Sequence, residues 1–191
     1  MVNFKKIWHF IWYDDSPLSW FINIILALIL VKFVIYPGLG FVLNTTHPLV
    51  AVVSSSMDHN GLKFDEWWEK SGSWYEQNGI TKEEFKIYSF KHGFNRGDIM
   101  VLKGTKEKSV GDVLVYQKQN SFDPPIIHRA VKINSDSFQT KGDNVVIVQE
   151  FEKEIKNGAF IGKAILRIPY LGYIKIIFVD VLLRPIITIF K

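Results

Sequence analysis

Two serines that follow an apolar run are the first residues that suggest chemistry. Ser54 and Ser56 come after the β-branched run Val50–Val53 and stand two positions apart. Side chains two apart on a strand face the same side, so the two hydroxyls are expected to lie together. One could attack a carbonyl while the other donates to the developing oxyanion. Serine-rich turns are common, so the pair by itself is also typical of an ordinary turn.

A serine nucleophile needs a base to take its proton, and five histidines are available. His128 differs from the others because it lies inside the strand-like run Ile126–Ile133. His9 precedes the long apolar stretch, and His47 and His59 fall in expected loops. An imidazole within a strand either faces solvent or serves a site, and from composition alone a structural role is the commoner explanation.

One acidic residue, Asp143, lies in the segment Lys141-Gly142-Asp143-Asn144, which is typical of a turn. Its commoner role would be hydrogen bonding within that turn. Ser54, Ser56, His128 and Asp143 are thus candidates for chemistry, and each pattern taken alone is also explained by a structural role.

Composition excludes several classes of function. The chain of 191 residues has no cysteine, so disulfides, thiolate zinc sites and cysteine nucleophiles are excluded. The 23 basic and 19 acidic residues leave a net charge of +4, and the basic residues are scattered, which does not indicate a nucleic-acid partner. We expect neither a metal nor a cofactor.

One apolar stretch near the N-terminus is long enough to span a membrane. Residues 18–43 contain a single charge, Lys32, and Leu18–Tyr36 is the most helical part before Pro37 and Gly38 interrupt the pattern. No small-x-small cleavage site follows, so we expect a retained anchor with membrane lipid around it. Lys5 and Lys6 favour an N-terminus in the cytoplasm, which makes 1–17 a cytoplasmic segment.

The chain after the anchor reads as mainly β, with short strands separated by Gly, Asp and Pro. This pattern predicts a β-barrel or folded sheet over residues 44–173 on the extracytoplasmic side. The expected strands are Val50–Val53, Ile99–Leu102, Val113–Tyr116, Ile126–Ile133, Phe138–Lys141 and Ala159–Ile168.

A helical insert is expected within residues 58–94. Phe64, Trp67, Trp68 and Tyr75 fall on one helical face, and Thr81-Lys82-Glu83-Glu84 forms a capping box for a second short helix. The pair would form a helical hairpin packed on the sheet; an aromatic face in the lipid interface and a substrate lid are the alternatives.

The C-terminal segment 174–191 is apolar but carries charges and Pro185. These features argue against a second full span and favour an interfacial or partly inserted helix.

Several sequence boxes occur in an order that resembles the type I signal peptidases. The resemblance extends over about residues 12–57 and 95–175. The boxes that carry it are Pro48–Met57 with its S-x-S-M ending, Gly97-Asp98-Ile99, Gly111–Tyr116, Ile127-His128-Arg129-Ala130-Val131, Thr140–Asn144, and Gly162–Gly172. Bacterial relatives carry lysine at the place of His128, so the histidine points to the archaeal and endoplasmic-reticulum branch.

This resemblance implies roles for particular residues. Ser56 would be the nucleophile, His128 the general base, and Ser54 with the Ser56 backbone N–H the oxyanion hole. Asp143 would support the histidine. The family usually has a further Asp five or six residues later, where this chain has Val148 and Gln149. We therefore expect Asp143 to orient His128, with Glu150 or Glu152 as alternatives.

The function implied is a single-pass membrane serine endopeptidase that removes signal peptides from preproteins after small residues, through an acyl-enzyme. Its partners would be preprotein signal peptides, lipid and the secretion machinery. The alternative is a catalytically silent membrane-tethered β module of a secretion complex.

Overall fold

The computed structural model describes residues 4–118 and 124–174, which divide into an N-terminal unit up to Val42 and a second unit from Leu43. The predicted C-terminal helix in 174–191 lies outside the described residues, apart from Ile174.

The N-terminal unit is helical. Helix α1 spans Phe4–Tyr13, and α2 spans Pro17–Leu30. Ser16 caps α2, because its hydroxyl accepts a hydrogen bond from the Ser19 backbone N–H at 3.2 Å. Proline at the first helical position suits this start, since the missing N–H would have had no partner there.

The helix then runs further than the sequence predicted. A π-helical turn at Val31–Ile35 (η1) leads into α3, Tyr36–Val42, so Pro37 does not end the helix. The wider turn directly before the proline relaxes the hydrogen-bond pattern that Pro37 would otherwise break. Among the described residues, Pro17–Val42 is the one helix that could cross a membrane by length and composition.

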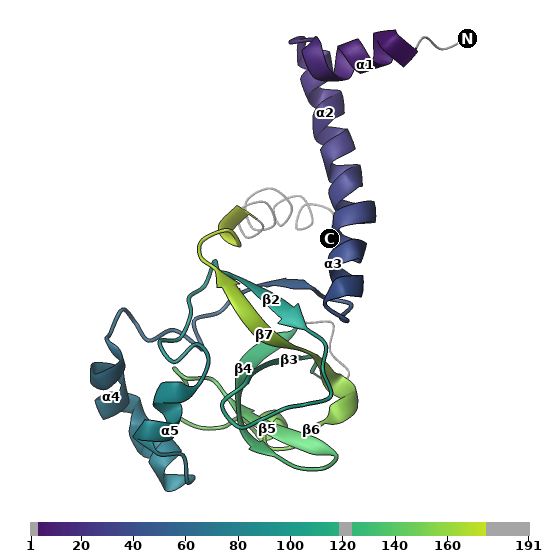
Figure 1. Ribbon diagram of the computed structural model, residues 1–191. Coiled ribbons are helices and arrows are strands. Elements are labelled where there is room, and N and C mark those ends of the chain that lie inside the picture. The colour runs from purple at the N-terminus through teal and green to yellow at the C-terminus, as the bar shows by residue number, and fades with distance from the viewer. Residues whose placement is uncertain (1–3, 119–123, 175–191) are drawn as a thin grey trace, which may run out of the picture. The chain divides into compact units, whose positions relative to one another are not determined.

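The second unit is a seven-stranded antiparallel sheet that curls into a half-barrel (Figure 1). Its order is β1-β2-β7-β3-β4-β5-β6. The bounds are β1 Leu49–Ala51, β2 Ile99–Lys103, β3 Val113–Tyr116, β4 Ile126–Ile133, β5 Ser137–Lys141, β6 Ile155–Lys156 and β7 Phe160–Ile168. Six of these are the predicted strands; β6, with two residues, is too short to leave a pattern.

Strand β3 lies at the centre of this sheet and is buried on both faces. Val113 and Val115 belong to one hydrophobic cluster, whereas Leu114 and Tyr116 belong to another. On the Leu114 face the partner from β4 is His128. A polar side chain is therefore placed on a face that is otherwise packed with apolar groups.

The helical insert is a hairpin of α4, Phe64–Gln77, and α5, Lys82–Ile87, as predicted. Thr81 caps α5 with the predicted capping box. The aromatic face of α4 is buried with Phe85 and with Val131 of β4. Contact of this face with the lipid interface, one of the alternatives above, is therefore wrong, because its side chains already pack inside the protein.

Candidate active site

Ser56 lies in the turn that follows β1, and two hydrogen bonds fix its backbone there. The Asn144 N–H donates to the Ser56 carbonyl at 2.8 Å, and the Asn144 side-chain amide donates to the Ser55 carbonyl at 3.1 Å. Met57, next in the chain, is buried in the core. The backbone of Ser56 is thus fixed between the buried side chain of Met57 and the turn after β5, while the Ser56 side chain stays partly exposed.

The predicted contact between hydroxyl and imidazole is confirmed. His128 Nε2 lies 2.8 Å from Ser56 Oγ, although the two residues are 72 positions apart. The Ser54 hydroxyl lies 3.1 Å from Ser56 Oγ, so the two serines do point the same way. The ring of His128 is largely withdrawn from water, with 8% of the residue exposed.

Glu152, from the 3-10 helix η2 at Glu150–Glu152, is the carboxylate that contacts the other ring nitrogen of His128. The same Oε1 accepts hydrogen bonds from the Thr140 hydroxyl at 3.0 Å and the Tyr116 hydroxyl at 3.2 Å. The carboxylate is fully buried. Three polar partners compensate for the water that it has lost.

These contacts keep Glu152 ionised. Burial would raise its pKa, but the hydrogen bond and electrostatic attraction to His128 and the hydrogen bond from Thr140 outweigh burial and lower it. Burial and the neighbouring charge of Glu152 raise the pKa of Tyr116, which therefore remains a donor.

An ionised carboxylate accepts hydrogen bonds and cannot donate them, so it fixes the tautomer of the imidazole. His128 must carry its proton on Nδ1, toward Glu152, and Nε2 of the neutral ring is left with a lone pair. Ser56 then donates to Nε2. This arrangement is ready for proton transfer from the serine to the imidazole.

Asp143 does not occupy the place that the sequence argument favoured. Its carboxylate accepts hydrogen bonds from Arg129 Nη2 at 2.7 Å and from the Tyr75 hydroxyl at 2.8 Å, and it pairs with His59 Nε2 at 3.2 Å. The His128 nitrogen that was assigned to it is held by Glu152 instead. The side chain of Asp143 is directed toward the helical insert, which contains both Tyr75 and His59.

Gly142 lets the backbone pass directly beside the site. A Cβ added there would lie 3.0 Å from His128 Nε2 and 2.8 Å from the Ser56 carbonyl oxygen. Any larger side chain would push against His128 and Ser56 together. The glycine of the Thr140–Asn144 box is therefore explained by close packing against the pair.

A buried ionic cluster joins this region to the insert, and sequence reasoning missed it. Arg129 binds Asp143 through two nitrogens and also donates to the carbonyls of Ser89, Phe90 and Gly111. His59 stacks on Trp67 with 3.8 Å between ring centroids. The only signal in the sequence was Arg129 beside His128 within a strand, where an arginine needs a buried partner.

A pocket opens beside Ser56 and His128, with a volume of about 330 Å³. Its walls are mostly apolar and include Ala51, Val53, Ile127 and Phe151. Ser56 and His128 thus face a mostly apolar space.

A serine hydroxyl, an imidazole and a buried carboxylate connected in this order define a serine hydrolase, and the folded antiparallel sheet carries them beside an apolar pocket. No protein-family model matches the chain.

Curated proteins do match most of its length. The signal peptidase complex catalytic subunit SEC11 of Lachancea thermotolerans is 30% identical over 172 residues, which cover 83% of this chain and 82% of that protein. The protein of that name from Scheffersomyces stipitis is 27% identical over 159 residues, covering 78% and 75%, and that from Fusarium vanettenii is 26% identical over 164 residues, covering 79% and 76%.

The chain belongs to this family of signal peptidase catalytic subunits and is a serine endopeptidase. The predicted type I signal peptidase of the endoplasmic-reticulum branch, with its fold class, is confirmed. The alternative of a catalytically silent module has no support, because the relatives are named as the catalytic subunit.

Proposed function

We propose that this enzyme removes signal peptides from secreted preproteins with Ser56 as nucleophile, His128 as general base and Glu152 as the residue that positions the base. The observation that carries the proposal is the 2.8 Å contact between Ser56 Oγ and His128 Nε2, backed by Glu152 on the opposite ring nitrogen. The signal peptidase names of the relatives support this substrate class.

The reaction is acyl transfer. Ser56 Oγ attacks the carbonyl carbon at the cleavage site while its proton moves to His128 Nε2. The tetrahedral intermediate collapses, the C–N bond breaks, and His128 returns the proton to the leaving amine. Water, deprotonated by the same imidazole, then hydrolyses the ester and frees Ser56.

The oxyanion of the intermediate needs donors that are aimed at it. The Ser56 backbone N–H is one donor, and the Ser54 hydroxyl, now 3.1 Å from Ser56 Oγ, is the other after rotation about its side-chain bond. A donor of this kind is typically worth about 3 kcal/mol of transition-state stabilisation.

The substrate binds as an extended strand beside Val50–Ser54. Strand β1 stands first in the order of the described sheet, so one of its edges is open to an added strand. The residue before the cut enters the pocket at Ala51 and Val53, beside Ser56. Signal-peptide cleavage sites carry small residues at this position, in a small-x-small pattern.

Residues 18–43 anchor the enzyme as a single pass, with 1–17 in the cytoplasm and the catalytic domain 44–173 outside it. The apolar length of Pro17–Val42 supports the span, and Lys5 and Lys6 support this direction. The anchor tethers the catalytic domain to the membrane in which signal peptides are inserted and in which the secretion machinery lies.

Asp143 does not contact His128 or Ser56 through its side chain but supports the turn that holds Ser56. Its pairing with Arg129 fixes the turn 142–144, and Asn144 of that turn holds the backbone of Ser55 and Ser56. Its loss would displace the nucleophile without changing the chemistry of the base.

The test is cleavage of a radiolabelled preprotein by the full chain in membranes. Ser56→Ala and His128→Ala should each lower the rate by at least about a thousandfold, because the nucleophile or its base is gone. Ser55→Ala is the matched control: its side chain is exposed and takes no part in the proposed reaction, so the rate should stay near wild type. Full processing by Ser56→Ala would refute the assignment.

A further inference from the structure

Three hydrogen-bond donors meet at one oxygen of Glu152. Its Oε1 contacts His128 Nδ1 and accepts hydrogen bonds from the Thr140 hydroxyl at 3.0 Å and the Tyr116 hydroxyl at 3.2 Å. A carboxylate oxygen has two lone pairs, so the three donors have to share them. The imidazole of His128 therefore competes with two hydroxyls for the same negative charge.

The two hydroxyls also contact each other, with 2.9 Å between Tyr116 Oη and Thr140 Oγ1. Each hydroxyl has one proton and the ionised carboxylate has none, so two protons serve the three contacts among these oxygens. The two protons cannot both lie between the hydroxyls, because one oxygen must accept what the other donates. At least one proton therefore points at Glu152 Oε1.

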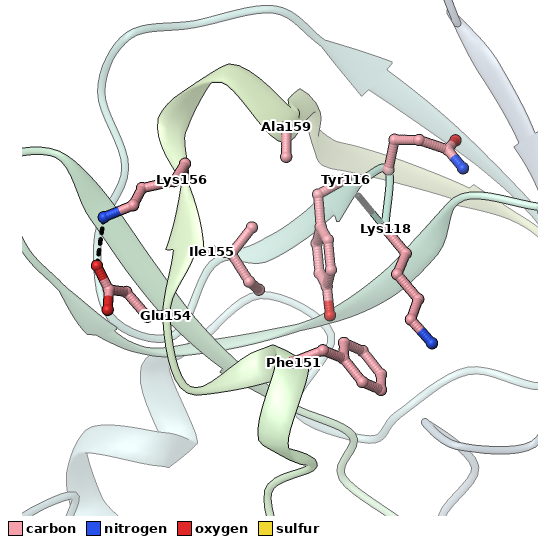
Figure 2. A pocket seen from close by; sticks show the side chains of 8 residues that line it. Tyr116, Lys118, Phe151, Glu154, Ile155, Lys156 and Ala159 are labelled. Carbon is pink, nitrogen blue, oxygen red and sulfur yellow. Dashed lines mark hydrogen bonds and ion pairs between the residues drawn. The ribbon is translucent and has the colours of Figure 1, made fainter. Parts of the chain in front are cut away.

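The phenol of Tyr116 is held in place by packing. Its ring is buried and meets the ring of Phe138 edge-on, with 5.8 Å between the centroids. Ile155 and Ala159 lie beside it around a cavity of about 180 Å³. Figure 2 shows the hydroxyl end of Tyr116 directed to the segment that carries Phe151, the neighbour of Glu152. Tyr116→Phe would keep this packing and remove one oxygen.

The titratable groups that face Glu152 come from three strands. His128 of β4 contacts it directly, and Lys141 of β5 is attracted to it, while burial lowers the pKa of Lys141 to about 8. Burial and the charge of Glu152 raise the pKa of Tyr116 of β3, so the phenol stays protonated and remains a donor. Changes at Tyr116 and Thr140 therefore alter the hydrogen bonds of the carboxylate and leave the charged residues in place.

We propose that Tyr116 and Thr140 are positioning residues that draw charge away from the contact between Glu152 and His128, and so set the lowest pH at which the base can act. The inference rests on the proposed function, in which the neutral imidazole takes the proton of Ser56. An imidazolium cannot take that proton, so the rate falls as His128 becomes protonated. The hydroxyls share the charge that would otherwise hold the imidazolium, which keeps the ring neutral to a lower pH.

The experiment measures kcat/KM for preprotein cleavage by the full chain in membranes, from about pH 5 to about pH 9, a range centred near the usual pKa of histidine. The readout is the acid midpoint, the pH at which kcat/KM reaches half of its plateau. In Tyr116→Phe/Thr140→Val both hydroxyls are gone, and the acid midpoint should rise by about one pH unit. Thr140→Val alone leaves Tyr116 as a donor and should raise it by about half a unit.

Two controls separate hydrogen bonding from damage to the fold. Thr140→Ser keeps the hydroxyl and should keep the wild-type acid midpoint. Tyr75→Phe removes an equally buried phenol oxygen, which bonds Asp143 rather than Glu152, so it should leave the acid midpoint in place even where it lowers the plateau. A loss of folded enzyme scales the whole profile, so a merely structural role predicts no shift of the midpoint.

An acid midpoint of Tyr116→Phe/Thr140→Val that stays at the wild-type value or falls overturns the inference, as does an equal rise in Tyr75→Phe. The proposed function then still stands if Ser56→Ala is inactive. If the double variant does not fold, Thr140→Val and Thr140→Ser decide: a rise in the valine variant alone supports the inference, and equal midpoints reject it. Cleavage by Ser56→Ala would instead reject the proposed function itself.

Discussion

The carboxylate that contacts His128 is not the one that the sequence motifs favoured. Asp143 lies in the Thr140–Asn144 box and was the favoured partner of His128, yet the ring nitrogen is held by Glu152, nine positions later. A glutamate side chain is one methylene longer than aspartate and reaches the imidazole from the far end of a 3-10 turn. The backbone N–H of Gln149 donates to its second oxygen at 3.3 Å and fixes the carboxylate plane.

Changing that carboxylate to an amide tests its role. Glu152→Gln keeps the shape of the side chain but removes the negative charge that stabilises the imidazolium and selects its tautomer. We expect kcat to fall by about 10²- to 10⁴-fold with little change in KM, because substrate does not touch this group. The measurement is preprotein cleavage at several substrate concentrations.

Glu150→Gln is the matched control. Glu150 opens the same short helix, pairs with Lys153 and is largely exposed, so its loss should leave kcat within about twofold of wild type. It was also one of the alternatives that the sequence left open. A Glu152→Gln enzyme with wild-type kcat, or a Glu150→Gln enzyme with the large loss, would contradict the assignment.

At the scale of elements, most of the sheet and the insert followed from patterns in the sequence. The alternation and β-branched content of the strands predicted their positions. Gly97 and Gly111, which precede β2 and β3, adopt left-handed backbone conformations in the structure. Strand β6 was missed because two residues carry no period. The helix end near Pro37 was placed too early because a π-turn accommodates the proline.

The candidate site was predictable only in part, for a physical reason. Ser54, Ser56 and His128 lie at or in elements with local signals, and their meeting follows from the pairing of strands. Glu152 sits in a turn whose place depends on the path of the chain after β5, for which no local pattern exists. The cluster of Arg129, Asp143 and His59 is likewise tertiary, since its members come from three separate segments.

This cluster predicts a dependence of stability on pH. Burial would raise the pKa of Asp143, but the charge of Arg129 and the hydrogen bond from His59 hold it well below its usual value. A carboxylate with a depressed folded pKa stabilises the fold above the unfolded pKa of about 4, and that contribution is lost as pH falls through the folded value.

Asp143→Asn should therefore lower the melting temperature at pH 7 and flatten its fall below about pH 4. The loss at neutral pH should be large, on the order of 3–5 kcal/mol, because Arg129 keeps a buried charge without its partner. Thermal unfolding of the full chain in detergent between pH 3 and 7 measures both effects.

Asp136→Asn, at an exposed turn, is the control with the same change of charge and should behave like wild type. Should Asp143→Asn not fold, His59→Phe provides the second measurement. It keeps the stack on Trp67 and removes only the bond to Asp143, and its melting temperature should fall at neutral pH. Unaltered melting curves in His59→Phe and Asp143→Asn would count against the cluster as a stabilising element.

At the scale of the whole molecule, the site exists only when three distant parts of the chain come together. The hydroxyl comes from the turn after β1, the imidazole from the middle of β4, and the carboxylate from η2 after β5. Long-range strand pairing must therefore be complete before the serine becomes reactive. We infer that the contacts from Glu152 to His128 and from His128 to Ser56 make this one serine, among many in the chain, a nucleophile.

Covalent labelling tests that claim most directly. The folded full chain in membranes is treated with a serine-directed phosphonate, digested, and analysed by mass spectrometry for the modified residue. We expect label on Ser56 and not on Ser54 or Ser55, with labelling slowed by about a hundredfold or more in His128→Ala and Glu152→Gln. Label on another serine, or labelling of Ser56 that does not depend on His128, would contradict it.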